Sequence, residues 1–252
     1  MVESQEIRVL KRDVFGRVEL LGRGGGLFVR RIACGGRVPG SRLVARALAR
    51  RERRALTALA GLVGIPRLVV DESLAGLRDA DGFAPDARDV VLRSWIEGVP
   101  LHLAERLPGD FFDQLDALVG EMHARGVCHN DLHKEQNIVV DAGGWPALID
   151  FQLASVHSGD SHVRRARIQD DLRHLMKHRR RYTRDGRGPA EVGAGGSGRG
   201  IRRSPAALAW RRLAKPVYVW ITRGILHTRD GEERRPSSGP WPEWGPPVGP
   251  RP

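Results

Sequence analysis

Three polar residues in the middle of the chain are of the types that hold magnesium and phosphate groups. Asp131 and Asn137 stand in the polar stretch HNDLHKEQN, and Asp150 follows the apolar run ALI. Mg²⁺ prefers oxygen ligands, which carboxylates and amides supply. Phosphoryl transfer needs a carboxylate that orients the acceptor hydroxyl and a metal held on the phosphates. Asp131, Asn137 and Asp150 together supply that set.

The elements around these residues predict where they lie. The stretch FFDQLDALVGEMHARG has helical character and ends at Gly126, a residue that often follows a helix. NIVVD and PALIDF are expected to form two short strands joined by the turn AGGW. The polar residues should therefore lie at the mouth of a β-hairpin that follows a helix.

The N-terminal part has the pattern of strands with one inserted helix. IRVLKRD, GRVELL and LFVRRIA are β-prone and lie between turn signals, and PRLVV and DVVLRSWI predict two further strands. A helix is expected from Ser41, as its N-cap, to about Leu59. A further helix should cover roughly 163–182. The pattern indicates an α+β fold with two lobes.

HNDLHKEQN followed by IDF resembles the catalytic loop and metal-binding motif of protein kinases and their atypical relatives, such as RIO-type and bacterial lipopolysaccharide-core kinases. The resemblance covers roughly 7–182. It implies a two-lobed kinase-like fold that transfers the γ-phosphate of ATP, with Mg²⁺, to a hydroxyl. In that reading Asp131 orients the acceptor, His129 braces the loop, and Asn137 and Asp150 bind Mg²⁺.

The sequence departs from the family pattern at several places. Asp131 and Asn137 are six positions apart where the family has five, so Lys134 is expected to replace the lysine that meets the transferred phosphate. Asn130 stands for the family's arginine and Gln152 for the glycine of DFG, and no APE motif follows. We therefore expect no activation-loop switch.

The nucleotide side of the site has an arginine where the family has a lysine. Arg30 matches the lysine position, with Arg31 as the adjacent alternative, and only one of them can face the cleft. Glu52 lies on the apolar face of its predicted helix and should pair with one of the two. Loss of the lysine also suits the alternative of a catalytically impaired pseudokinase that serves as a nucleotide-binding scaffold.

Two further segments are expected to contact the nucleotide. GRGGG at 22–26 is interpreted as a hairpin turn, which leaves the turn at 13–16, with Gly16, to cover the phosphates. SWIEGVPL resembles the hinge between lobes, where the backbone of Ile96 and Glu97 would grip adenine. The resemblance also implies that a carboxylate on the predicted 163–182 helix braces the catalytic loop, and Asp171 is preferred over Asp170 for this role.

These interpretations divide the chain into a 1–97 N-lobe, a 98–182 C-lobe, a 183–204 flexible linker, a 205–228 helical segment and a 229–252 disordered Pro-rich tail. The helical segment is expected to dock on the C-lobe or lie at a membrane interface.

The formal net charge of +12 favours anionic partners. We expect ATP and a hydroxyl acceptor on a protein or an envelope glycolipid, and allow for peripheral contact with an anionic membrane surface. Nucleic acid is not expected, because charge alone points to it. The chain shows no signal-peptide pattern, and its two cysteines form no CxxC motif. We therefore expect a cytoplasmic protein, and allow for a peripheral location at the inner face of the membrane.

Overall fold

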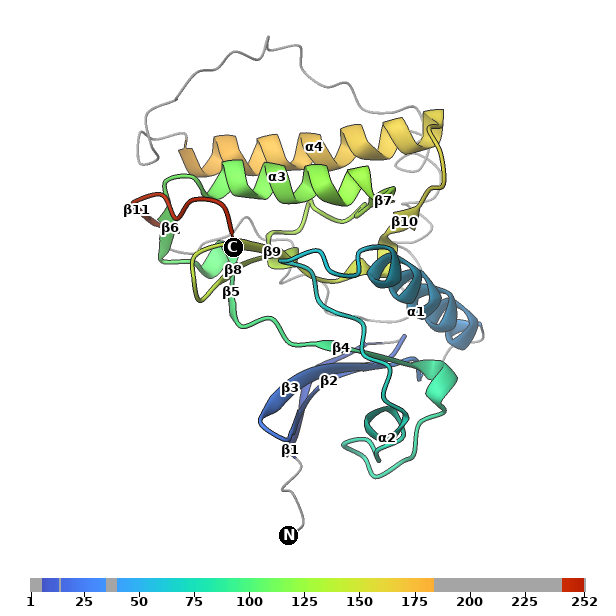
Figure 1. The fold of residues 1–252 in the computed structure, drawn as a ribbon. Coiled ribbons are helices and arrows are strands. Elements are labelled where there is room, and N and C mark those ends of the chain that lie inside the picture. Colours follow the sequence, from blue (N-terminus) through green and yellow to red (C-terminus); the bar gives the residue numbers. More distant parts are fainter. Residues whose placement is uncertain (1–5, 14, 35–39, 184–241, 252) are drawn as a thin grey trace, which may run out of the picture.

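The computed structural model describes residues 6–13, 15–34, 40–183 and 242–251. Within these ranges the chain has a β-rich N-terminal part and a largely helical C-terminal part, and it is an α+β protein (Figure 1). The predicted helical segment 205–228 and nearly all of the predicted linker lie outside the described residues. None of the described helices is long and apolar enough to span a membrane.

The N-terminal part is built on an antiparallel sheet with strand order β1-β2-β3-β4. Its strands are β1 (Glu6–Arg12), β2 (Arg17–Arg23), β3 (Gly26–Ile32) and β4 (Val90–Ser94). Gly24 and Gly25 turn the chain between β2 and β3 with φ angles of 57° and 74°, which glycine adopts readily. GRGGG is therefore a hairpin turn, as expected. PRLVV forms only an isolated bridge from Leu68 to Arg93 and not the predicted full strand.

Helix α1 (Ser41–Ala58) lies beside this sheet and also meets the C-terminal part (Figure 1). Its N-cap is Gly40, with φ at 78°, and not Ser41 as the sequence suggested. Ser41 is the first helical residue, and its buried hydroxyl forms no hydrogen bond with the described residues. The rest of this part contains the short helix α2 (Glu72–Ala75) and the 3₁₀ turn η1 (Ala87–Asp89).

The C-terminal part places a β-hairpin between two longer helices. Its helices are α3 (Phe111–Ala124) and α4 (His162–Thr183), with the 3₁₀ turns η2 (Leu101–Leu103), η3 (Glu135–Asn137) and η4 (Phe151–Leu153). The hairpin strands β8 (Ile138–Asp141) and β9 (Pro146–Leu148) form a sheet with β5 (Gly98–Pro100). β7 (Val127–Cys128) pairs with β10 (Ser155–Val156). The larger hydrophobic core joins α3, the hairpin and α4 to the end of α1.

The last described residues are folded onto the C-terminal part, so the expected disorder of the tail is wrong for 242–251. β11 (Glu243–Gly245) pairs in parallel with β6 (Arg106–Pro108). Trp244 packs against the core beside Phe112. Asp110 accepts hydrogen bonds from the N–H groups of Val248 and Gly249, both at 3.0 Å. Trp244 and these two main-chain amides therefore contact the C-terminal part in a segment whose Pro-rich composition suggested disorder.

Candidate functional site

The polar loop between β7 and β8 brings Asp131 and Asn137 together. Asp131 is 3% exposed and Asn137 is 4% exposed. The side-chain amide of Asn137 donates to the main-chain oxygen of Asp131 and to its Oδ2, both at 3.0 Å. These bonds fix the orientation of the amide, and its oxygen accepts no hydrogen bond from the described residues. That oxygen is therefore suited to a metal ligand.

Asp150 follows β9, at the same open end of the hairpin where Asn137 precedes β8. The N–H of Ile149 donates to the carbonyl of Asn137 at 3.0 Å, which holds the two strand ends together. Gln152, in the place of the family's glycine, donates to Asp150 Oδ1 at 2.5 Å. Burial would raise the pKa of Asp150, but Arg31, the Gln152 bond and Arg93 outweigh it and hold that pKa below its usual value. Asp150 is therefore an anion at neutral pH.

Two basic side chains flank the carboxylate of Asp131. His133 Nδ1 lies 3.0 Å from Oδ1, and Lys134 Nζ lies 3.3 Å from Oδ2. Burial would raise the pKa of Asp131, but His133 and Lys134 more than compensate and keep it lowered. Lys134 thus lies within the site, as its sequence position suggested.

The polar loop between β7 and β8 is braced from α4, as predicted, by Asp171. This buried carboxylate accepts the N–H groups of His129 and Asn130, both at 2.9 Å. His129 is fully buried, its Nε2 lies 3.0 Å from the carbonyl of Ile149, and its ring contacts Phe151. His129 therefore joins the loop to the strand that carries Asp150, in keeping with its expected bracing role.

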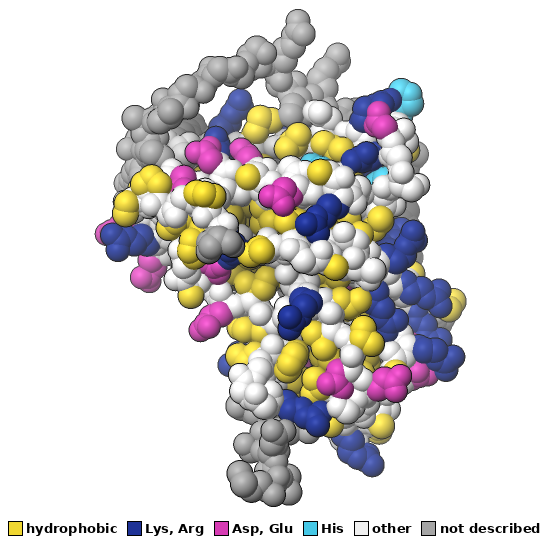
Figure 2. Space-filling model, in the orientation of Figure 1, with side chains coloured by type: hydrophobic (Ala, Val, Ile, Leu, Met, Phe, Trp, Pro, Cys, Tyr) yellow, Lys and Arg dark blue, Asp and Glu magenta, His cyan; other side chains and the backbone are white. Residues whose placement is uncertain are grey.

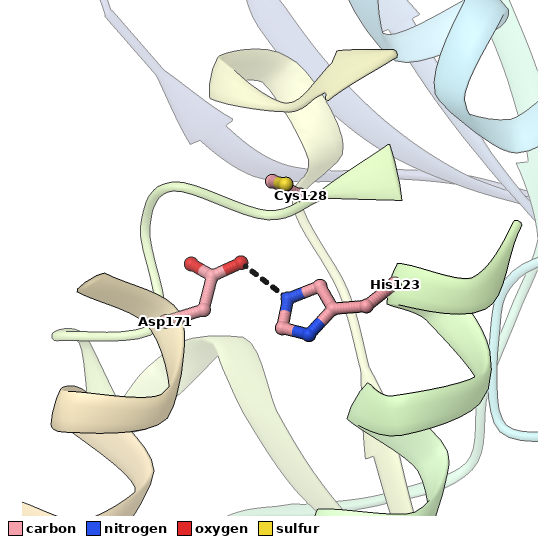
Figure 3. A group of neighbouring side chains, drawn as sticks. All are labelled: His123, Cys128 and Asp171. Atoms are coloured by element: carbon pink, nitrogen blue, oxygen red, sulfur yellow. Dashed lines mark hydrogen bonds and ion pairs between the residues drawn. The ribbon is translucent and has the colours of Figure 1, made fainter. Parts of the chain in front are cut away.

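Asp171 also faces His123 and Cys128, a group with the side-chain types of a metal site (Figure 3). His123 Nε2 lies 3.1 Å from Asp171 Oδ2. Both Asp171 oxygens already accept hydrogen bonds from the polar loop, and burial raises the pKa of the Cys128 thiol to about 12. We explain this buried group as part of the loop's hydrogen-bonded support.

On the nucleotide side, the structure corrects the choice of Arg30. Arg30 is fully buried on the other face of the sheet, where it donates to Glu19 Oε2 at 2.7 Å and to the carbonyl of Leu77 at 2.6 Å. Successive strand residues face opposite sides, so Arg31 faces α1 and the hairpin. Arg31 lies 3.4 Å from Glu52 and 3.9 Å from Asp150.

Glu52 is fully buried and pairs across to the sheet, as expected for an acid on an apolar helix face. Besides Arg31, it accepts a close hydrogen bond from Arg93 of β4. Sequence reasoning missed Arg93. The available signal was a single cation directly after the apolar run VVL of this strand, because such a charge needs a buried partner.

The remaining expected nucleotide contacts lie around the edges of the N-terminal sheet. Gly16 closes the β1–β2 turn, where Asp13 Oδ1 accepts the N–H groups of Phe15 and Gly16, both at 2.8 Å. This turn lines a hollow of about 550 Å³. Ile96 and Glu97 lie in the connection between β4 and β5, with Ile96 half-buried and Glu97 exposed. Their contact with adenine stays a prediction.

The donor set at the hairpin mouth fits magnesium. Asp150 offers a carboxylate and Asn137 an amide oxygen, and both are hard oxygen donors. The Asn137 amide is already oriented by Asp131, and Asp150 is held by Gln152. Because both side chains offer oxygen donors and are held in place by hydrogen bonds, Asn137 and Asp150 would hold the ion.

Comparison with known proteins gives one informative relative. No protein-family model matches the chain. CBL-interacting protein kinase 16 of Oryza sativa subsp. japonica is 30% identical over 166 residues, which are 61% of this chain and 36% of that protein. The chain therefore spans little more than a third of that relative's length. The match supports a kinase-like relationship for this α+β protein.

Proposed function

We propose that this protein is a phosphotransferase that moves the γ-phosphoryl group of Mg-ATP to a hydroxyl acceptor, on a two-lobed kinase-like framework. The observation that carries the proposal is the convergence of Asp131, Asn137 and Asp150 at one hairpin mouth, with Asn137 bonded to Asp131. The partial similarity to a plant protein kinase points in the same direction.

Each side chain has a role in this proposal. Asp131 orients the acceptor hydroxyl and takes its proton while the acceptor oxygen bonds to the γ-phosphorus and ADP leaves. Lys134, beside Asp131, neutralises charge on the transferred group. Bound Mg²⁺ supplies charge neutralisation of the phosphates. Asn137 and Asp150 would hold that ion, and Arg31 would contact the phosphates.

The acceptor is proposed to be a serine or threonine of a protein or a sugar hydroxyl of an envelope glycolipid. The segment between Asp150 and α4 is short, with only η4 and β10 in it. It offers little room for an extended peptide platform, which favours a compact or non-peptide acceptor. We place the protein in the cytoplasm, with the inner membrane face as a further site of action.

Turnover of ATP by the Asp131→Asn variant tests the proposal. We expect Mg-dependent γ-phosphate release to fall by roughly 10²–10⁴-fold, because the substitution removes the proton acceptor. Nucleotide binding should persist, since Asn keeps the size of the side chain. Unchanged turnover would exclude Asp131 from the reaction.

A catalytically impaired nucleotide-binding scaffold is the second candidate. The specific observation that favours it is an arginine, Arg31, at the position where kinases have lysine, because a guanidinium does not copy a compact ammonium. Binding of Mg-ATP by the wild type, with no release of phosphate in the presence of varied acceptors, would select this candidate.

A further inference from the structure

Glu52 lies between two arginines of neighbouring strands, but its contacts with them are unequal. Arg93 donates a close hydrogen bond to Oε1. Arg31 approaches Oε2 with its Nε at 3.4 Å, and neither of these two atoms forms a hydrogen bond within the described residues. Arg93 is therefore the partner that holds the carboxylate.

The guanidinium of Arg31 is held loosely between two acids. Its side chain is only 10% exposed, and its second contact, with Asp150, is 3.9 Å long. Buried N–H groups nearly always have a hydrogen-bond acceptor in folded proteins. The Arg31 side chain forms no hydrogen bond with the described residues, so its donors can bind an anionic group without breaking one of these contacts.

The sheet register explains why both arginines reach the same carboxylate. Val29 of β3 is opposite Arg93 of β4, and Arg31 is two residues further along β3. Residues two apart on a strand share a face, so both guanidinium groups point toward α1, which carries Glu52. Regular strands and a helix position all three side chains.

We infer that Arg93 is a positioning residue: it anchors Glu52 and so leaves Arg31 to bind the phosphates of the nucleotide. The choice of ligand rests on the proposed function. Without Arg93, the buried carboxylate of Glu52 would have Arg31 as its remaining close cation and would draw the guanidinium to itself. In kinases a single lysine both pairs with the helix glutamate and contacts the phosphates. Here Arg93 pairs with Glu52, and Arg31 binds the phosphates.

Titration of Mg-ATP against single and double variants tests this division. We expect Arg93→Met to weaken binding by about 10- to 100-fold, the loss of one or two charged hydrogen bonds. Glu52→Gln in the Arg93→Met background should recover most of the affinity, because no carboxylate then competes for Arg31. Arg31→Met should weaken binding to a similar degree, and Glu52→Gln should not recover it.

Arg88→Met is the matched control, because Arg88 is an exposed arginine just before β4 and should leave affinity unchanged. Failure of Glu52→Gln to restore binding in the Arg93→Met background would overturn the inference. Where Arg93→Met does not fold, Arg93→Lys replaces it. The lysine keeps the charge but loses the second donor, so partial weakening with recovery by Glu52→Gln is expected.

Thermal unfolding without nucleotide tests the anchor separately. Arg93→Met should lower the unfolding midpoint and Glu52→Gln should restore part of it, whereas Arg31→Met should have a smaller effect. Equal losses from Arg31→Met and Arg93→Met, equally restored by Glu52→Gln, would overturn the anchoring role. A wild type that binds no Mg-ATP would overturn the proposed function, while this second measurement would still decide the role of Arg93.

Discussion

Asn130 and Asp150 are the two non-glycine residues with positive φ among those that the structure describes, at 65° and 66°. This conformation is uncommon outside glycine and costs free energy, although Asn and Asp tolerate it better than other residues. Both residues border the candidate site. Asn130 is held by Asp171 and by the Leu153 carbonyl, and Asp150 by Gln152. Local strain therefore coincides with the candidate site, because Asp150 is one of the side chains proposed to do chemistry and Asn130 directly precedes Asp131.

Asp150→Asn isolates the charge of this residue, because asparagine also tolerates positive φ and the backbone should be kept. We expect Mg-dependent nucleotide binding to weaken at least about tenfold, since a charged ligand of the ion becomes neutral. Calorimetric titrations with and without Mg²⁺ would measure it. Equal affinity with and without metal in the wild type would contradict the metal role of Asp150.

At the level of elements, the end of α4 is tied to the polar loop between β7 and β8 through Glu135. The carboxylate accepts a hydrogen bond from the hydroxyl of Tyr182 at 2.9 Å and lies 3.2 Å from Arg181. His178 of the same helix face is 3.6 Å from Glu135, and its Nε2 is 2.8 Å from the carbonyl of Leu132. α4 thus supports both ends of the loop. Asp171 of α4 contacts the start of the loop, and the C-terminal end of α4 contacts Glu135 near the end of the loop.

The Glu135 contacts predict a stability that depends on pH. Burial alone would raise the pKa of Glu135, but His178 and Tyr182 outweigh it and lower the pKa from 4.5 to about 2. A lowered folded-state pKa stabilises the protein above pH 4.5, and this contribution is lost as the pH falls toward 2.

We expect Glu135→Gln to destabilise the protein by about 1–3 kcal/mol at neutral pH and progressively less below pH 4.5. Thermal unfolding of both proteins across this range would measure the difference. A difference that stays constant from pH 7 to pH 3 would contradict the ionic role of Glu135. Asp113→Asn, which loses exposed pairing with Arg179, is a suitable surface control.

For the whole molecule, the return of 242–251 to the folded part joins distant regions of the chain. β11 adds to β6, and Arg251 pairs with Asp141 and lies over the ring of Trp145 in the β8–β9 turn. In Figure 1 the red end of the chain lies beside β6 and near β8, on the side of the hairpin away from α1. The tail thus secures the hairpin whose other end carries Asn137 and Asp150.

Charge is distributed unevenly over this molecule. Figure 2 shows Lys and Arg side chains gathered over the region of α1, while the upper part of the same face mixes hydrophobic, acidic and basic groups. Several of these arginines are already committed to the fold, since Arg42 and Arg46 pair with Asp89 and Arg53 donates to main-chain carbonyls. Part of the positive charge of the chain therefore serves in ion pairs and hydrogen bonds that stabilise the fold.

Trp244→Ala tests how far the tail belongs to the folded unit. We expect a loss of about 2–4 kcal/mol of unfolding free energy, because a large ring packed against Phe112 and the core is removed. Denaturant unfolding would measure it, with Leu103→Ala, an exposed leucine, as the control. A loss no larger than that of the control would show that the tail contributes little. Truncation after Tyr182 should be destabilised for the same reason.

The sequence alone determined the local chemistry and most element positions. HNDLHKEQN and IDF carry their acids and amide within a short stretch, so the site around Asp131, Asn137 and Asp150 could be predicted from neighbouring residues. Helices α1, α3 and α4 were expected from the sequence, and the bracing position of Asp171 was expected from the resemblance to kinases.

The tertiary structure decided which distant side chains meet. Arg30 and Arg31 are chemically identical neighbours, and only the register of β3 against β2 and β4 shows that Arg31 faces Glu52. Arg93 became a partner of Glu52 because β4 lies beside β3, and Trp244 joined the core through pairing of β11 with β6. Such contacts depend on the order of the strands in the sheet and on the pairing of segments far apart in the sequence, which composition and local periodicity do not encode.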